Sequence, residues 1–447
     1  MAALTLEITP GQLALTQLPE PQLCYVLLTI VPAGSAGSAA INWALVADAS
    51  RSMRIPIVSE EQFRELLRAG AAQETLVDGV PVWQLTGPVP PDVRAEAPSA
   101  LDFVARALHS VVDRLADRDR FALVACAEEA LVLTRSASGA DRAALARGIG
   151  RLPSLNLGEQ TDLAHGIELG LNELRRGRDG QRAERLLLLT DGFTQRPEEC
   201  LRLADAAAAE GVAISTIGLG GEFQEDVLTG LADRSFGRAV FLRKPDAIPR
   251  AVAAELQAAR SLAARGAMLR LRPAAGVALR RATRLRPALA ILDGTIAPAA
   301  GGAFELALGD IAEPQQLLLE LMAPPQPVGL APLARCELLA EGQLQAASEL
   351  VARYLPSAPP PPAQVIDAAA RANAARLQQR ALDTAARGDA FEASRLLRAA
   401  AARLTALGEP GLAELARTQA DALEQHGRAN ALATKELTYA TRRLGGG

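Results

Sequence analysis

Continuous apolar runs alternate with helical segments between residues 41 and 260, and this alternation limits the folds open to the chain more than any other feature. A run such as Leu186-Leu-Leu-Leu189 is apolar on both faces of an extended strand, so both faces must be covered. Strands separated by helices favour parallel pairing. The sequence therefore predicts an α/β domain over residues 41–260 with a doubly wound, mostly parallel sheet. Strands are expected at 43–47, 121–125, 185–190 and 212–218, and helices near 100–116, 141–150, 162–176, 197–210, 223–234 and 246–260.

The segments on either side of this domain show a different pattern, in which short apolar runs are separated by proline and glycine. Residues 1–40 and 261–350 both have the strands and turns that this pattern predicts. The pair Asp293-Gly294 is a strong signal for a hairpin turn. Since the two segments flank the α/β domain, we expect them to build one β-sandwich into which the α/β domain is inserted.

Helical patterns dominate after the proline run at 359–362. Residues 360–443 are predicted to form a C-terminal α-helical module. Residues 444–447 are expected to be a flexible tail. The helices of the module, in a three-helix bundle, are expected at 364–386, 388–405 and 410–442.

Composition and charge argue against several classes of protein. The formal net charge of -4 comes without the basic domain or stripe that nucleic-acid binders carry. No stretch of about 18 apolar residues predicts a membrane span, and the N-terminus lacks the pattern of a secretory signal. The four cysteines are far apart and form no CxxC pair, as expected of reduced thiols. We therefore expect a cytoplasmic protein that binds neither membranes nor nucleic acid.

Oxygen-bearing side chains gather at three places where strands end or a helix begins. Asp48-Ala-Ser50-Arg-Ser52 follows the first strand of the α/β domain, and Thr190-Asp191-Gly192 ends its most apolar strand. Gly158-Glu-Gln-Thr161-Asp162 precedes a helix. The carboxyl ends of parallel strands meet at one edge of a sheet, where such folds bind their ligands. The sequence therefore predicts one site at this edge.

These three segments, in this order, resemble the von Willebrand factor A domain and its metal-ion-dependent adhesion site. The resemblance covers residues 41–260, about half of the chain, and extends to Ile217-Gly-Leu-Gly-Gly-Glu-Phe223 and the helix after it. It implies a Rossmann-like fold and a bound divalent cation, with Mg²⁺ expected and Mn²⁺ or Ca²⁺ as alternatives. The residues that it assigns to the metal are Asp48, Ser50, Ser52, Thr161 and Asp191.

The chemistry of these ligands explains what such a site does. Serine and threonine hydroxyls are neutral, and carboxylates that act largely through waters leave a small hard cation incompletely neutralised. The cation then keeps an open position, which a partner's Asp or Glu carboxylate completes in the adhesion-type family. The resemblance therefore implies a non-enzymatic, metal-dependent protein-protein interaction protein of the scaffold, adaptor or regulatory kind.

Two departures from the family's pattern leave all five ligands in place. Arg51 stands between the serines, where many members have glycine, and the loop before Thr161 reads Gly-Glu-Gln in place of a glycine-rich version. Two interpretations of Arg51 stay open: it favours acidic partners, or it points to solvent.

An inserted segment, residues 54–99, separates the first metal-binding loop from the first helix. It is predicted to contain a short helix over 60–68 and a hairpin over 74–83 with its turn at Asp78-Gly79. Because it leaves directly after Met53, we expect it beside or over the metal face. Two roles stay open, a determinant of specificity and a structural brace, and Trp83 would be a contact residue or a packing anchor accordingly.

The common catalytic motifs are absent from the sequence. There is no HExxH zinc motif, no GxxxxGK[ST] phosphate loop and no G-x-S-x-G nucleophile elbow. The three histidines, His109, His165 and His426, are far apart in sequence. We therefore expect no enzymatic activity.

Two alternative functions stay open. In the first, the metal of one copy binds a carboxylate of the next, with Glu409 or Glu414 as donor, and the chain assembles into an oligomer or filament. In the second, the ending Leu444-Gly-Gly-Gly447 resembles the tail of ubiquitin-type modifiers. The chain has two lysines, Lys244 and Lys435, which would limit self-modification. A plain disordered tail is the simpler interpretation of that ending.

Overall fold

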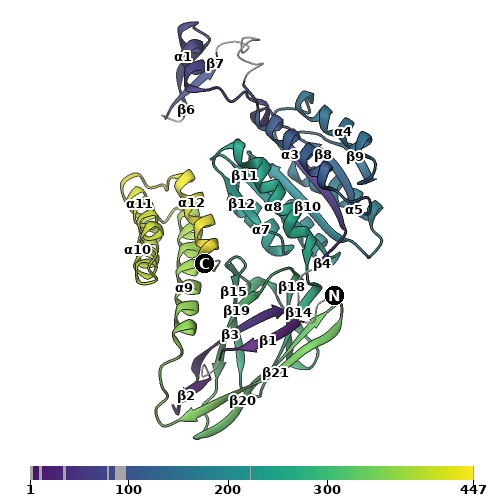
Figure 1. The fold of residues 1–447 in the computed structure, drawn as a ribbon. Helices are drawn as coiled ribbons and strands as arrows, with labels where there is room; N and C mark the ends of the chain where they lie inside the picture. Colours follow the sequence, from purple (N-terminus) through teal and green to yellow (C-terminus); the bar gives the residue numbers. More distant parts are fainter. Residues whose placement is uncertain are drawn as a thin grey trace.

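The computed structural model describes residues 4–9, 13–33, 37–77, 80–85, 97–221 and 223–445. It has three parts: an α/β domain, a β-sandwich and a C-terminal helical module (Figure 1). The predicted fold class, a doubly wound sheet inserted in a β-sandwich and followed by helices, is confirmed. Among the helices of the described residues, none has the length and apolarity needed to cross a bilayer.

The α/β domain is built on a six-stranded sheet in the order β12-β11-β10-β5-β8-β9. All neighbours pair in parallel except β8 and β9. The two edge strands β9 and β12 were not expected from the sequence. The strands are β5 (Ile41–Asp48), β8 (Arg120–Cys126), β9 (Ala130–Ser138), β10 (Ala183–Thr190), β11 (Val212–Leu219) and β12 (Ala239–Leu242).

Helices cover both faces of this sheet, as the continuously apolar strands require. Along β5, Trp43, Leu45 and Ala47 join the core on one face with α3, α4 and α8, whereas Ala44 and Val46 face α5, α6 and α7. The helices are α3 (Ala100–Arg114), α4 (Arg142–Arg151), α5 (Leu163–Gly177), α6 (Pro197–Ala209), α7 (Glu225–Arg234) and α8 (Ile248–Arg260).

The sandwich combines the start of the chain with residues that follow the α/β domain. One sheet has the order β1-β3-β19-β15-β16 and the other β17-β18-β14-β20-β21-β2. Their facing side chains form one apolar core. The strands are β1 (Leu4–Ile8), β2 (Ala14–Thr16), β3 (Gln22–Pro32), β14 (Ala264–Pro273), β15 (Ala278–Arg286), β16 (Ala290–Ile291), β17 (Ile296–Ala299), β18 (Ala303–Ile311), β19 (Gln315–Ala323), β20 (Gly329–Ala340) and β21 (Gln343–Leu355).

The hairpin expected at Asp293-Gly294 is wrong. These residues lie in a short 3-10 turn between β16 and β17, which belong to different sheets. The Asp293 carboxylate accepts a hydrogen bond from the Ala282 amide at 2.9 Å, so the aspartate anchors a crossover between the sheets.

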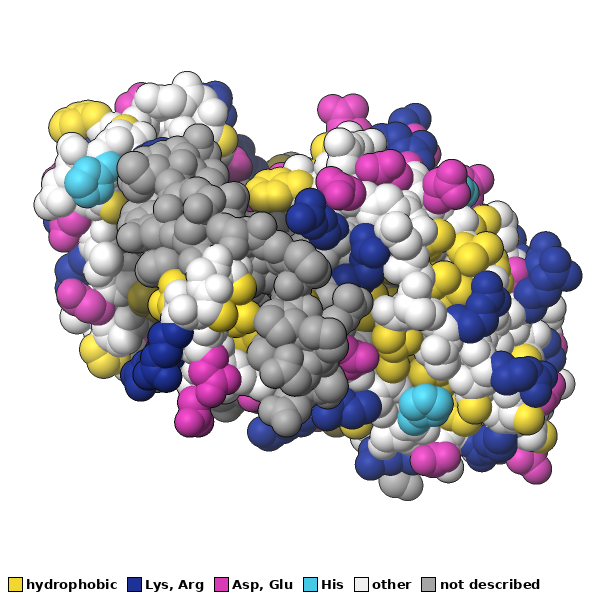
Figure 2. Space-filling view, turned by 90° about the horizontal axis from the view of Figure 1, so that it is seen from above, with side chains coloured by type: hydrophobic (Ala, Val, Ile, Leu, Met, Phe, Trp, Pro, Cys, Tyr) yellow, Lys and Arg dark blue, Asp and Glu magenta, His cyan; other side chains and the backbone are white. Residues whose placement is uncertain are grey.

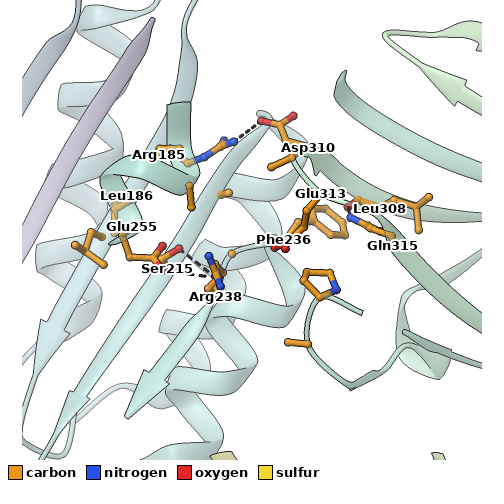
Figure 3. A pocket seen from close by; sticks show the side chains of 18 of the residues that line it. Arg185, Leu186, Ser215, Phe236, Arg238, Glu255, Leu308, Asp310, Glu313 and Gln315 are labelled. Carbon is orange, nitrogen blue, oxygen red and sulfur yellow. Dashed lines mark hydrogen bonds and ion pairs between the residues drawn. The ribbon is translucent and has the colours of Figure 1, made fainter. Parts of the chain in front are cut away.

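The α/β domain joins the sandwich through two chain crossings that lie side by side. β4 (Gly37–Ser38) pairs with β13 (Ser261–Leu262) in an antiparallel ladder. Beside this junction Arg185 Nη2 lies 2.8 Å from Asp310 Oδ2, across the cavity between the two domains (Figure 3). Both charged side chains are mostly buried, so this ion pair helps to fix the domains relative to each other.

The inserted segment forms α1 (Glu60–Arg68) and the antiparallel pair β6 (Ala72–Val77) and β7 (Val80–Leu85). The helix begins at a capping box in which Ser59 and Gln62 exchange hydrogen bonds. These elements stand away from the α/β domain (Figure 1), and α1 buries Leu66 against neighbouring apolar residues of the same segment. The turn residues Asp78-Gly79 and the side chain of Trp83 lie outside the described residues.

The helical module contains four helices, so the expectation of three is wrong. They are α9 (Ala363–Ala386), α10 (Ala390–Ala406), α11 (Pro410–His426) and α12 (Ala431–Arg442). The helix expected over 410–442 breaks because Gly427 adopts a left-handed conformation (φ 69°) and Asn430 caps a new helix through the Ala433 amide.

The prediction of a flexible tail that begins at residue 444 is wrong for Leu444 itself. The Leu444 side chain is buried in the core of the helical module. Its carbonyl oxygen accepts a hydrogen bond from the Arg371 guanidinium. Gly446 and Gly447 lie outside the described residues.

The first helix of the module, α9, packs on the outer face of the sandwich sheet that contains β3, β19 and β15 (Figure 1). Leu27 and Leu318 point to this helix, whereas their neighbours along the strands point into the sandwich core. These strands are therefore apolar on both faces because both faces are covered.

Leu318→Ala should destabilise the protein by about 2–5 kcal/mol, because it opens a cavity between β19 and α9. The control is Leu330→Ala, which removes the same atoms from a leucine that is 70% exposed. It should change the free energy of unfolding by less than about 0.5 kcal/mol. Urea unfolding followed by circular dichroism measures both. Equal midpoints for the two variants would contradict the packing described here.

Candidate metal centre

Three loops meet at one edge of the α/β sheet. β5 and β10 are parallel neighbours whose register pairs Ala47 with Leu189, so Asp48 and Thr190 follow at the same level. The third loop reaches this edge through a bridge between Thr161 and Thr194. The edge predicted from the sequence is therefore the place where the three segments converge.

The structure brings all five predicted ligands together. Ser50 Oγ lies 3.1 Å from Ser52 Oγ, which donates to Asp191 Oδ1 at 2.7 Å. On the other side Thr161 Oγ1 donates to Asp48 Oδ2 at 3.4 Å. The five side chains thus lie in two hydrogen-bonded groups, Ser50 with Ser52 and Asp191, and Thr161 with Asp48, at the same edge of the sheet.

Asp48 is held by its surroundings from several directions. Its carboxylate is fully buried, which raises its pKa, whereas hydrogen bonds lower the pKa again, foremost that of Thr190. Thr190 Oγ1 donates to Asp48 Oδ2 at 2.5 Å, and the Ser50 amide donates to Oδ1 at 2.8 Å. The carboxylate is therefore fixed in one orientation.

The oxygen set fits a small divalent cation. Adjacent ligands of an octahedral Mg²⁺ with bonds of about 2.0–2.1 Å lie about 3 Å apart, close to the oxygen separations found here. Within the described residues no group of three or more His, Cys, Asp and Glu side chains gathers. A Cβ on Gly192 would stand 3.3 Å from Thr161 Oγ1, which shows how closely the loop after β10 approaches the loop before α5.

Comparison with known proteins agrees with this fold. Residues 97–253 match the family model of the von Willebrand factor type A domain. The chain carries a von Willebrand factor type A (vWA) domain. Residues 363–447 match the Sll0103-like, C-terminal alpha-helical domain. The match to the vWA model begins at residue 97, near the end of the inserted segment, and β5 with Asp48 belongs to the same sheet through its pairing with β10 and β8.

The similar proteins include two solved structures that cover nearly the whole chain and one curated protein. The von Willebrand factor type A protein from Catenulispora acidiphila has 17% identity and a TM-score of 0.75, covering 99% of this chain and 97% of that one. The ArnB paralog VWA2 from Sulfolobus acidocaldarius has 14% identity and a TM-score of 0.55, covering 99% of both chains. The uncharacterized protein sll0103 of Synechocystis sp. is 28% identical over 147 residues, 32% of this chain and 34% of that protein. The match to sll0103 thus spans about a third of that relative's length.

An open hollow of about 700 Å³ lies over the candidate site of the vWA domain. Ser50, Ser52, Thr161 and Asp191 line it, together with the loop after β11. The Phe193 side chain on its wall is 59% exposed. The hollow therefore offers an apolar wall beside the predicted metal ligands.

Charged side chains stand around this hollow. Arg51, whose side chain is 70% exposed, lies 3.3 Å from Glu159, so it sits at the rim and is paired there. Arg54 Nη2 donates to the Gly158 carbonyl at 3.2 Å and Nε to that of Ser50 at 3.4 Å. Arg54 therefore ties the first metal-binding loop to the second.

Sequence reasoning missed several residues that support the site. Thr190 holds the Asp48 carboxylate, and Thr194 accepts the Leu163 amide at 3.2 Å at the start of α5. The Thr194 amide donates to Gln224 Oε1 at 3.1 Å. Thr190 stands directly before Asp191 at a strand end, which was the available signal. The contact with Gln224 had none, since it joins residues 30 apart in the chain.

Thr190→Val should lower the free energy of unfolding by about 1–3 kcal/mol, because it keeps the shape of the side chain and removes a hydrogen bond to a buried carboxylate. Thr418→Val is the control, since the Thr418 hydroxyl bonds an exposed helix carbonyl at 3.0 Å. Chemical denaturation measures both. If the two variants lose equal stability, Thr190 does not hold Asp48 as described.

Proposed function

We propose that the vWA domain binds a protein partner by capturing one of its Asp or Glu carboxylates on a divalent cation. The observation that carries this proposal is the convergence of Asp48, Ser50, Ser52, Thr161 and Asp191 beneath an open hollow. Mg²⁺ is the cation that we expect, with Mn²⁺ or Ca²⁺ as alternatives.

The donor set supports binding at an open coordination position. The three hydroxyls add no negative charge, and Asp48 already accepts hydrogen bonds from Thr190 and from the Ser50 amide. A cation held in this way stays electrophilic and supplies attraction for an anionic ligand. The residues of the chain hold the cation, keep its ligands in place and leave its outer side open to the hollow.

The acidic groups around the hollow support a binding role rather than catalysis. Glu159 is paired with Arg51 and Asp162 with Arg196 at 2.5 Å. A general base needs a carboxylate or imidazole that is available to the substrate proton. These carboxylates are engaged with arginines, so we propose that the protein is not an enzyme.

Individual side chains at the hollow, rather than a large surface of one charge, would select the partner. Basic and acidic side chains are interspersed over the described part of the face shown in Figure 2. The exposed Phe193 and the rim cations Arg51 and Arg243 are the distinctive groups at the hollow. A partner segment with an acidic residue beside an apolar one fits these groups.

Ser52→Ala should weaken Mg²⁺ binding at least about tenfold, because it removes one oxygen from the set without unpacking the domain. Ser154→Ala is the control, since Ser154 is an exposed serine whose hydroxyl bonds the Arg151 carbonyl. Isothermal titration of the EDTA-stripped chain with Mg²⁺, Mn²⁺ and Ca²⁺ measures the affinities. No heat with any of the three cations would overturn the proposed function.

Light scattering with and without Mg²⁺ distinguishes capture of a separate partner from self-assembly. The mass should be the same in both conditions, because we propose that a separate protein supplies the carboxylate. A Mg²⁺-dependent rise in mass that Glu409→Gln or Glu414→Gln abolishes would point to an assembling protein instead; Glu414 is paired with Arg417 at 3.1 Å.

A further inference from the structure

Helix α12 packs on α11 and α9 of the helical module and also on the vWA domain (Figure 1). The Tyr439 ring enters the core of the vWA domain, with its centroid 6.2 Å from that of Phe223 and 5.7 Å from that of Phe241. Leu437, on the same helix, belongs to the core of the helical module. The helix therefore connects two cores.

Charged side chains of α12 hold the segment from Gly221 to Arg243. Lys435 is only 2% exposed, and its Nζ donates to the Gly221 carbonyl at 2.7 Å, beside Glu225 and over the Phe223 ring. Glu436 lies 2.7 Å from Arg243. A buried ammonium is stable only while such partners stay in place, so docking of α12 fixes the conformation of this segment.

Both ends of this segment, Gly221 and Arg243, line the hollow over the candidate metal site. Leu219 and Gly220, directly before the segment, line it as well. Gln224 accepts the amide of Thr194, whose neighbour Gln195 donates to the Thr161 carbonyl at 3.2 Å. Lys435 of α12 therefore contacts this loop directly, and the loop reaches Thr161 through Thr194 and Gln195.

The contact between Glu436 and Arg243 decides whether ligand binding favours or opposes the docking of α12. The Arg243 side chain is 68% exposed at the hollow, and Glu436 supplies its negative partner from within the chain. An acidic ligand that enters the hollow competes with Glu436 for this arginine. Binding of such a ligand and docking of α12 therefore oppose each other.

We propose that α12 is an autoinhibitory clasp: while docked it occupies Arg243 and restrains the loop after β11, and an acidic partner at the metal face releases it. This inference rests on the proposed function. By linkage, a ligand that releases α12 binds more tightly when α12 is already loosened.

The docked state contains a group that favours release. The Tyr439 hydroxyl is buried and has no hydrogen-bond partner among the described residues. An unsatisfied buried hydroxyl disfavours the docked state, because water would satisfy it on release. Tyr439→Phe should therefore tighten the clasp, whereas Glu436→Gln should loosen it.

The two lysines allow docking to be read directly. Lys244 is exposed and Lys435 is buried, so an N-hydroxysuccinimide ester should acylate Lys435 at least about tenfold more slowly than Lys244, by peptide mass spectrometry. Excess Mg²⁺ with a tetraglutamate peptide should speed acylation of Lys435 and leave Lys244 unchanged. Equal rates for the two lysines in the free chain would overturn the inference.

Affinity for the same peptide tests the coupling. In excess Mg²⁺, Glu436→Gln should bind tetraglutamate about fivefold more tightly than the unmodified chain, and Tyr439→Phe more weakly. Glu392→Gln is the control, since its partner Arg395 belongs to the same helix, α10. Equal Mg²⁺-dependent binding by all variants would overturn the clasp and leave the proposed function standing. No Mg²⁺-dependent binding by any variant would overturn both.

Discussion

The parallel pairing of β5 with β10 is the constraint on which the candidate site depends. It brings Asp48 level with Thr190, whose hydroxyl lies 2.5 Å from the carboxylate, and places Asp191 next along the chain. A slip of two residues in this register would separate these groups by about 7 Å, and a slip of one would turn their side chains to opposite faces. The covered, leucine-rich β10 resists both, since either slip would disturb the apolar contacts of the central strands.

Much of the fold could be predicted from the sequence, because the central strands and their helices are buried in regular patterns. The edge strands β9 and β12 are only partly buried: β9 mixes apolar and polar side chains, and β12 is apolar but only four residues long, so neither gave such a pattern. The break between α11 and α12 depends on one left-handed glycine and a following cap, within a sequence that is otherwise helical throughout. Asp293-Gly294 has the composition of a hairpin turn, and only the closure of two sheets decides where the next strand goes.

The candidate site also contains residues that could be predicted from the sequence and residues that could not. The five predicted ligands belong to local motifs, each at a strand end or a helix start. Their convergence could therefore be predicted from the order of strands and helices. Thr190 stands in one of these motifs, but its hydrogen bond to Asp48 joins residues 142 apart, and the contact of Gln224 with Thr194 follows from no motif. Lys435 is similar: the scarcity of lysine is visible in the composition, but its burial against Gly221 arises only when α12 docks on another domain.

The ladder between β4 and β13 places both ends of the vWA domain within one hydrogen bond of each other, with the Ala39 amide donating to the Arg260 carbonyl at 3.1 Å. The two connections to the vWA domain therefore lie side by side, and the strands of the sandwich keep their places around this junction. The chain therefore leaves the sandwich for the vWA domain and returns to it at a single point, and the insertion interrupts no strand of either sheet.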